Sequence, residues 1–317
     1  MIPQVGKGTS EMDIWSELKE EGINPSLIEE IKNFRETHDN IEEESRRRIP
    51  QSKFFYYGKE IWEAAAAAIL CGENLLLAGP KATGKNVLAE NLATVFGRPS
   101  WDISMHINVD ATSLIGADTL KAGEVVFREG PISKCAKQGG FGILDEVNMA
   151  KNEALAVLHA TLDFRRVIDI PGYDKLPLNA ATRFIGTMNY GYAGTRELNE
   201  ALVSRFVVLD MPILNRDDLG RLLRKGFPSL KPAWAEQIAV LFEELRLKVE
   251  SGEVSAKALD LRGILSALQL IEKNVNVKVA FEMGIINKAF DPFERQLTAD
   301  VVWSRIPQNA EKNTFFD

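Results

Sequence analysis

A glycine-bounded run near residue 80 has the residue types that bind a polyphosphate. It follows the apolar segment 75–78 and precedes a predicted helix that begins at Lys85. In that geometry several backbone N–H groups and the positive end of the helix dipole face one point. Lys85 can then reach the β and γ phosphates as a point charge. The residues expected to contact the phosphates are Gly79, Pro80, Lys81, Ala82, Thr83, Gly84, Lys85, Asn86 and Val87. The alternative is a glycine-rich strand-to-helix turn without a ligand.

Asn86 departs from the usual form of such a run. That form ends in Lys-Ser or Lys-Thr, whose hydroxyl binds Mg²⁺, whereas this chain has Asn86 after the lysine. An amide oxygen is a hard ligand that Mg²⁺ accepts, but the side chain is bulkier than a hydroxyl. Two consequences stay open: the nucleotide binds and is hydrolysed more slowly, or the metal is held differently.

An acidic pair follows a second apolar run. Asp145 and Glu146 end the segment 140–146, which we expect to be a buried strand. This places two carboxylates at the carboxyl edge of the sheet, beside the phosphate loop. Asp145 would hold Mg²⁺ directly or through water, and Glu146 would polarise the attacking water. Alone, such a pair is often only the start of a helix; after a phosphate loop, the catalytic interpretation is favoured.

Two further polar residues complete the candidate set. Asn189 ends another predicted strand and could orient water or sense the γ phosphate, although asparagine is common in turns for local reasons. Arg205 precedes the last predicted strand and could stabilise transition-state charge as an arginine finger. The alternative is a salt-bridged surface arginine. A finger that faces away from its own phosphate loop must serve a neighbour, which implies an oligomer.

Short apolar runs that alternate with helical stretches must position these residues. Such runs are typical of a parallel sheet covered on both faces. The predicted strands are Asn74–Ala78, Ser100–Ile103, Gly142–Leu144, Arg183–Thr187 and Phe206–Leu209. After Asn215 only helical periodicity remains, with helices expected at Leu219–Leu223, Trp234–Val249, Leu261–Ile271 and Val279–Phe290. We therefore expect a helical extension at 1–52, with two short helices broken at Gly22–Pro25, an α/β core at 53–212 and an α-helical lid at 213–317.

Composition narrows the class of protein. The chain has 317 residues, 45% of them hydrophobic and 26% charged, with no apolar run long enough to span a membrane. A net charge of −7 argues against a mainly electrostatic nucleic-acid binder, although a local basic patch is compatible with it. The start of the chain lacks the apolar core of a signal peptide. Cys71 and Cys135 have no metal-ligand spacing, so we expect two buried thiols in a cytoplasmic protein.

The order of these motifs resembles that of AAA+ ATPases, over roughly residues 54–300. The residues within the motifs are similar to those of the MoxR and dynein-related branch. The stretches that carry this likeness are Phe127–Ile132, Ile143–Asn148 and Met188–Leu198. The resemblance implies a P-loop NTPase core of three α/β/α layers, a five-stranded parallel sheet of order 5-1-4-3-2 and a helical lid. It also implies ATP and Mg²⁺ as ligands, ATP hydrolysis, and a hairpin insert near Asp118 to Arg128.

The resemblance assigns further roles to single residues. Asn189 would be sensor one and Arg205 the arginine finger. Arg262 matches the sensor-two arginine of the lid, although the usual Ser or Pro before it is absent, and whether it acts on its own or a neighbour's nucleotide stays open. Tyr57 precedes the first core helix, where relatives place the adenine; a packing role is equally expected.

The main functional hypothesis is an ATP-hydrolysing ring that remodels or activates a protein client. Relatives in this branch form hexameric homo-oligomers and act as chaperone-like machines, often with a von Willebrand factor A-domain partner. One alternative is a nucleotide-dependent assembly or switch protein with little turnover, which Asn86 motivates; another is a nucleic-acid-directed motor. In the insert, Val125, Val126 and Phe127 could grip a polypeptide, but we expect a buried hairpin strand there.

Overall fold

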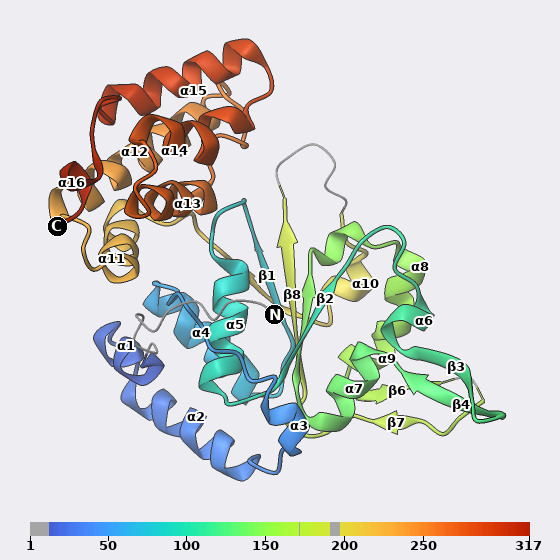
Figure 1. Cartoon of the computed structure of the whole chain (residues 1–317). Coiled ribbons are helices and arrows are strands. Elements are labelled where there is room, and N and C mark those ends of the chain that lie inside the picture. Colours follow the sequence, from blue (N-terminus) through green and yellow to red (C-terminus); the bar gives the residue numbers. More distant parts are fainter. Residues whose placement is uncertain (1–12, 171, 191–196) are drawn as a thin grey trace. The chain divides into compact units, whose positions relative to one another are not determined.

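The computed structural model describes residues 13–317, apart from residue 171 and residues 191–196. The described residues form two compact units (Figure 1). The larger unit lies within 1–78, 85–190 and 195–210, and the smaller unit lies within 79–84, 191–194 and 211–317. The domain boundaries expected at 52/53 and 212/213 stay predictions.

A five-stranded sheet is the centre of the larger unit, in the order β2-β5-β8-β1-β9. Its strands are β1 (Leu75–Gly79), β2 (Ser100–Ser104), β5 (Phe141–Asp145), β8 (Arg183–Asn189) and β9 (Val207–Asp210). The pairs β1–β9, β2–β5 and β5–β8 run parallel. The five predicted strands are thus confirmed, with boundaries shifted by at most two residues. Numbered along the chain and taken from the other edge, the order is 5-1-4-3-2. Every residue of β1 is buried, as its run of leucines requires.

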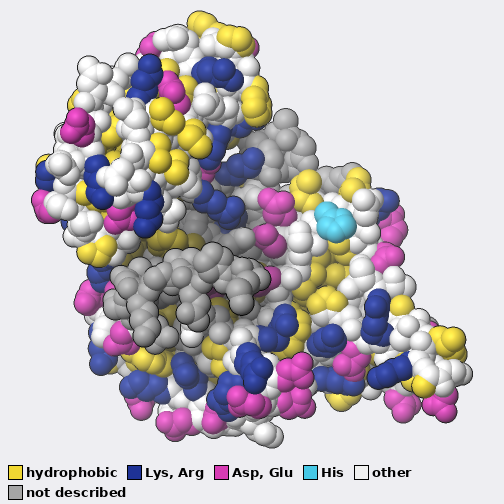
Figure 2. Space-filling model, in the orientation of Figure 1, with side chains coloured by type: hydrophobic (Ala, Val, Ile, Leu, Met, Phe, Trp, Pro, Cys, Tyr) yellow, Lys and Arg dark blue, Asp and Glu magenta, His cyan; other side chains and the backbone are white. Residues whose placement is uncertain are grey.

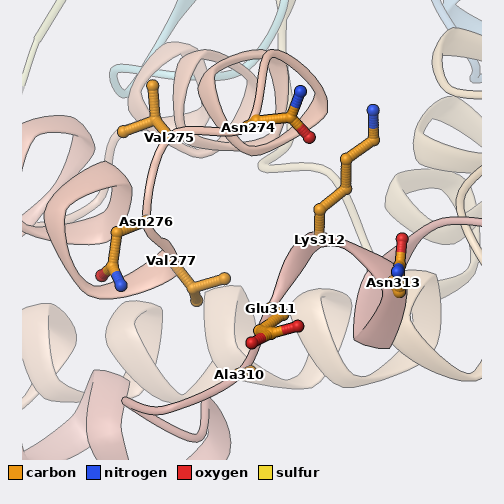
Figure 3. Close-up of a pocket in the computed structure, with 8 residues that line it drawn as sticks. All are labelled: Asn274, Val275, Asn276, Val277, Ala310, Glu311, Lys312 and Asn313. Carbon is orange, nitrogen blue, oxygen red and sulfur yellow. The ribbon is translucent and has the colours of Figure 1, made fainter.

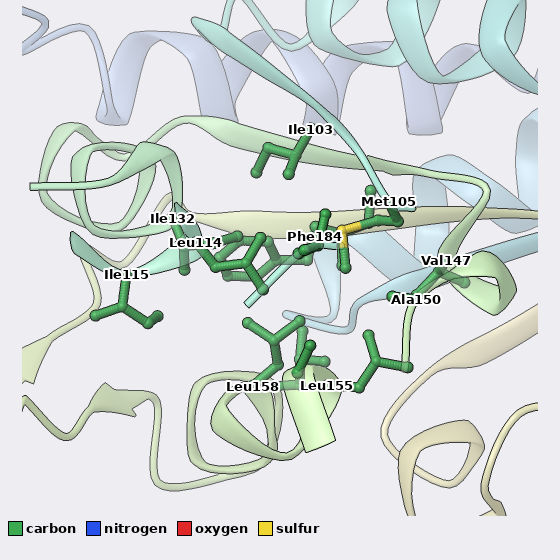
Figure 4. Packing of buried hydrophobic residues seen from close by; sticks show 14 of the residues in the cluster. Ile103, Met105, Leu114, Ile115, Ile132, Val147, Ala150, Leu155, Leu158 and Phe184 are labelled. Atoms are coloured by element: carbon green, nitrogen blue, oxygen red, sulfur yellow. The ribbon is translucent and has the colours of Figure 1, made fainter. Parts of the chain in front are cut away.

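Helices lie on both sides of this sheet (Figure 1). On one side are α4 (Lys59–Leu70) and α5 (Lys85–Val95), and on the other are α7 (Pro131–Gln138) and α9 (His159–Leu162). One hydrophobic cluster joins the sheet to the second group of helices; Phe184 of β8 lies among Leu114, Ile132 and Leu158 (Figure 4). Phe184 fits because β5 has a glycine beside it: a Cβ on Gly142 would come within 2.5 Å of the ring. This packing fixes β5 against β8.

An antiparallel hairpin of β3 (Gly116–Lys121) and β4 (Glu124–Glu129) projects from the larger unit. It turns at Ala122 and Gly123, both at positive φ, which suits a two-residue hairpin loop. The predicted insert is therefore confirmed, but the buried strand expected for its valines is wrong. Val125 is 66% exposed and its cross-strand partner Leu120 73% exposed, because both lie next to the turn of the hairpin, whereas Phe127, on the same pleat face as Val125, lies nearer the core and packs against it. Figure 2 shows hydrophobic side chains at the end of this hairpin.

An N-terminal helical arm packs on the α4–α5 side of the sheet, with helices α1 (Ile14–Glu20), α2 (Pro25–Thr37) and α3 (Glu43–Arg46). The first two confirm the predicted pair broken at Gly22–Pro25. Arg35 of α2 donates to the carbonyls of Thr94 (3.3 Å) and Val95 (3.1 Å) at the end of α5. A cation there complements the negative end of the helix dipole. The arm therefore braces the helix that starts at Lys85.

The smaller unit is helical in the part of it that the structure describes. Its α-helices are α11 (Arg216–Gly226), α12 (Pro232–Glu250), α13 (Leu261–Glu272), α14 (Val277–Gly284), α15 (Pro292–Arg305) and α16 (Lys312–Phe315). The helix expected at Val279–Phe290 is wrong at its end, because α14 stops at Gly284, where the backbone approaches Gly263 of α13 too closely for a Cβ. A shallow polar cavity of about 340 Å³ lies between residues 274–277 and 310–313 of this unit (Figure 3).

The cysteines and helix lengths bear on two further expectations. Cys135 is buried on α7, as expected, but Cys71 is exposed, and the expectation of two buried thiols is wrong for it. Cys71 lies before β1, as expected, but it caps the end of α4 in the turn between the two elements, where its side chain is exposed. Among the described helices, none combines the length and hydrophobicity needed to cross a membrane.

Candidate active site

The loop between β1 and α5 has the backbone of a tight, anion-binding turn. Ala82 has φ of +63° and Gly84 has φ of +81°, both in the left-handed region. Successive residues of mixed handedness form the concavities of backbone N–H groups that bind anions. A Cβ on Gly79 would come within 2.6 Å of the Met211 carbonyl, so glycine is required there. Thr83 closes the loop by donating its hydroxyl to the Pro80 carbonyl at 3.1 Å.

Lys85 is the first residue of α5 and is buried, with 6% of its surface exposed. Burial lowers the pKa of its ammonium group to about 8, while the carboxylates of Asp145 and Glu146 oppose that shift. The Lys85 ammonium group therefore interacts electrostatically with both acidic residues that the sequence predicts for the site. A cation in these surroundings is less well solvated than in water, so the negative charge of a polyphosphate would stabilise it.

Asp145 is the last residue of β5 and is held by two donors. The Thr187 hydroxyl donates to its Oδ1 at 2.7 Å, and the Asn86 Nδ2 donates to the same oxygen at 3.0 Å. Asn86 belongs to the first turn of α5, so the start of that helix lies at the carboxyl end of β5. The two residues predicted to share a metal ion are thus brought together.

Glu146 follows immediately, in a strained conformation. Its φ of +55° and ψ of +50° are uncommon for a residue with a side chain. Its backbone N–H donates to the Thr187 hydroxyl at 3.1 Å, and its Oε1 accepts from Asn189 Nδ2 at 3.0 Å. The Asn189 carbonyl in turn accepts from Asn148 Nδ2 at 3.0 Å. Such strain persists where the surroundings impose it, as these bonds do here.

Thr187 is the site residue that the sequence did not single out. It is 1% exposed, and its one hydroxyl joins Asp145 to the backbone of Glu146. A signal existed: residues 187 and 189 alternate with 188 and so share one face of β8. Threonine is also a common strand former, however, and that interpretation hides a functional hydroxyl.

Arg205 lies outside this cluster of contacts. Its Nε donates to the His159 carbonyl at 3.1 Å, its Nη1 donates to the Ala201 carbonyl, and its Nη2 lies 3.6 Å from Asp163. None of these partners contributes to the network around Asp145. The structure therefore holds Arg205 firmly, but on a separate set of residues.

The sequence also predicts site roles for Tyr57, Arg262, Lys81 and Val87. Tyr57 is buried in the larger unit with its ring edge-on to Phe55, so packing accounts for it, and nucleotide contact stays a prediction. Arg262 is exposed on the first turn of α13 in the smaller unit, and its sensor role stays a prediction. Lys81 is exposed and Val87 half-buried.

Comparison with known proteins decides the family. Residues 74–206 match the family described as the AAA domain (dynein-related subfamily), a span that runs from β1 past Arg205. The chain is also 34% identical over 249 residues to Uncharacterized protein SAB1265c of Staphylococcus aureus (strain bovine RF122 / ET3-1), covering 76% of this chain and 94% of that one. The chain belongs to the dynein-related AAA family. A second relative, Uncharacterized protein SH1500 of Staphylococcus haemolyticus, is 31% identical over 80% of this AAA protein and 98% of its own length.

A solved structure from Cytophaga hutchinsonii is similar to this AAA protein at a TM-score of 0.47 and 16% identity, covering 93% of this chain and 91% of that chain. A likeness of that size adds nothing to the assignment. The narrower MoxR placement stays a prediction, since the matching family is the broader dynein-related one.

The donors in this AAA domain fit Mg²⁺. Mg²⁺ is usually bound by one or two protein oxygens together with substrate phosphates and water. Asp145 would supply a carboxylate, and Asn86, whose Nδ2 donates to Asp145, would supply its amide oxygen. No larger group of His, Cys, Asp or Glu side chains that could bind a metal occurs in the part of the chain that the structure describes. Two oxygen donors, at the start of α5 and at the end of β5, suit a metal that arrives with its nucleotide.

The buried lysine predicts that the affinity of this AAA domain for ATP depends on pH. Bound phosphates raise the Lys85 pKa above its free value of about 8, so nucleotide binding takes up a proton wherever the free lysine has lost its own. We expect the dissociation constant for ATP to be constant below about pH 7. Above pH 8 the dissociation constant should rise, and binding therefore weaken, by up to about tenfold per pH unit.

Isothermal titration of ATP between pH 7 and 9.5 measures this dependence. Lys85→Arg is the matched control, because a guanidinium stays protonated throughout that range. A wild-type profile as flat as that of the control would contradict the assigned lysine pKa.

Proposed function

We propose that this AAA protein binds ATP with Mg²⁺ and hydrolyses it within an oligomer. The observation that carries the proposal is the network in which Thr187, Asn86 and Asn189 hold the adjacent carboxylates of Asp145 and Glu146, near the buried Lys85. Catalytic side chains must be held in a narrow range of geometry, and their neighbours provide that restraint. A mere helix start would not need three polar side chains to fix its two acids.

Each residue in the network then has a chemical task. Lys85 and the loop amides hold the phosphate charge. Glu146 accepts the proton of the attacking water, and Asn189 orients the carboxylate through Oε1. Asp145, with Asn86, would hold the Mg²⁺, which supplies charge neutralisation to the phosphates when bound. Arg205 would act on the nucleotide of a neighbouring copy, which supports an oligomeric, ring-like assembly such as a hexamer.

The proposed outcome of hydrolysis is the remodelling or activation of a protein client. The exposed Leu120 and Val125 on the β3–β4 hairpin support this, since exposed apolar side chains on a projecting element suit contact with a polypeptide. A von Willebrand factor A-domain partner remains part of the proposal through the MoxR resemblance. The net charge of −7 favours a protein client over a nucleic acid.

A second candidate function is a nucleotide-dependent switch with little turnover. The hydrogen bond from Asn86 to Asp145 favours it, because this bond occupies an oxygen of the carboxylate that would face the metal. Threonine at this position would replace the amide with the smaller hydroxyl of the usual motif. The two candidates therefore differ in what limits the rate.

Asn86→Thr is expected to raise the turnover rate by about tenfold and to lower the Mg²⁺ concentration needed for half-maximal rate. Phosphate release, measured while Mg²⁺ is titrated at saturating ATP, reports both quantities. Asn86→Ala is the control, since it removes the amide without adding an oxygen, and its rate should fall. If Asn86→Thr and Asn86→Ala behave alike, the side chain at 86 has no part in metal binding. If the wild-type protein shows no turnover above a Glu146→Gln variant, the switch is the better account.

A further inference from the structure

Arg205 lies beside the carboxylate of Asp163, a residue outside the network around Asp145. The chain leaves α10 (Glu200–Val203) and reaches Arg205 just before β9. Its Nη2 lies 3.6 Å from Oδ2 of Asp163, which follows α9. The Arg205 side chain is 22% exposed and that of Asp163 13%. The guanidinium is thus fixed in orientation yet partly accessible from outside.

Asp163 is itself held by a second arginine. Arg165 Nε donates to both carboxylate oxygens at 3.1 Å, and its Nη2 donates to Oδ2 at 2.6 Å. The hydrogen bond from Arg165 is the main reason that the pKa of Asp163 lies below its usual value, and Arg205 contributes to the same shift. One carboxylate therefore lies between two guanidinium groups. The three side chains together have one net positive charge, which can attract an external anion.

Phe164 stands between these charged residues, and 92% of its surface is exposed. An exposed large aromatic beside arginines is the residue pattern found at the centre of protein–protein contacts. Arg205, the arginine proposed to contact a nucleotide, lies on this surface. Its own contacts lie outside the network around Asp145 of the same subunit. A second copy of this chain is therefore the partner that fits: its nucleotide would supply the anion, and its surface would cover the phenylalanine.

We propose that Asp163 is a positioning residue that holds Arg205 against the triphosphate bound by a neighbouring copy, with Phe164 as an anchor of that contact. The inference rests on the proposed function. Without Asp163, the guanidinium groups of Arg165 and Arg205 repel each other, and only the carbonyls of His159 and Ala201 remain to orient Arg205. The loss falls on the rate of hydrolysis, because the nucleotide-binding residues of the same subunit are untouched.

The first test separates rate from binding. Asp163→Ala should lower kcat by about tenfold or more and leave the affinity for ATP unchanged, and Asp163→Glu should retain more of the rate than Asp163→Ala. Phe164→Asp should shift the oligomer toward smaller species in sedimentation, and higher protein concentration should restore its rate. An Asp163→Ala protein with wild-type kcat overturns the inference.

The second test mixes subunits. Asp163→Ala keeps Glu146, whereas Glu146→Gln keeps Asp163 and Arg205. A mixed contact in one of its two orders therefore places an intact arginine on an intact site. We expect the mixture to release more phosphate than the two proteins measured separately, as should an Arg205→Ala and Glu146→Gln mixture run beside it. Recovery with Arg205→Ala but not with Asp163→Ala would overturn the role of Asp163 and leave the proposed function standing. No turnover by the wild-type protein would overturn both.

Discussion

Replacing Glu146 with Gln is expected to stop ATP turnover while ATP still binds. The amide keeps the size of the side chain and its contact with Asn189, but it cannot accept the proton of the attacking water. Removal of a general base typically costs about 10² to 10⁴ in rate. Phosphate release at saturating ATP measures the loss, and titration with labelled ATP measures the affinity that remains.

Glu153→Gln is the matched control for that experiment. It makes the same substitution on α8 (Asn152–Leu155), where the side chain is exposed, so its turnover should equal that of the wild type. A Glu146→Gln protein that turns over ATP at the rate of this control would remove Glu146 from the chemistry. The catalytic interpretation of the acidic pair would then be wrong.

Thr187→Val should have the second largest effect. Valine keeps the shape of threonine but removes the hydroxyl that donates to Asp145 and accepts from the Glu146 N–H. A buried donor left without its partner costs about 1 to 3 kcal/mol, and the strained Glu146 backbone loses one of its restraints. We expect turnover to fall about 10- to 100-fold, as is usual when a residue that orients a catalytic group is lost.

Thr298→Val separates that effect from stability alone. Thr298 of α15 is also fully buried, and its hydroxyl donates to the Glu294 carbonyl at 2.9 Å. Thermal unfolding should show comparable losses for the two variants, whereas only Thr187→Val should lose turnover. Equal turnover in the two proteins would mean that Thr187 only stabilises the fold.

The sheet and its carboxyl edge could be predicted because their signals are local. A strand such as β1 is buried on both faces, so its leucines form an unbroken apolar run. A glycine and the start of a helix then mark where that run ends. Parallel strands bring their carboxyl ends to one edge, and this is why Asp145 and Asn189 could be expected near each other from their positions alone. In the structure, Asn189 donates a hydrogen bond to Glu146, the residue that follows Asp145.

Features that depend on distant contacts could not be predicted in the same way. The role of Thr187 exists only because β8 lies beside β5, and a single threonine carries no mark of such a neighbour. Val125 is as apolar as a core valine, and only its position near the turn of the projecting hairpin exposes it. Helix α14 ends where Gly284 meets Gly263, a tertiary contact that helical periodicity does not reveal. Arg205 was chosen for its place before β9, but the carboxylate that holds it lies 42 residues earlier in the chain.

The central claim is that the start of α5 and the end of β5 together bind Mg²⁺ and a triphosphate. Equilibrium binding of a fluorescent ATP analogue to the wild type and to Lys85→Ala, with and without Mg²⁺, tests it most directly. We predict Mg²⁺-dependent binding by the wild type and a loss of at least about tenfold in affinity for Lys85→Ala, since a charge-assisted hydrogen bond to phosphate contributes about 1.5–3 kcal/mol. Equal affinities for the two proteins, or no binding by the wild type, would contradict the account.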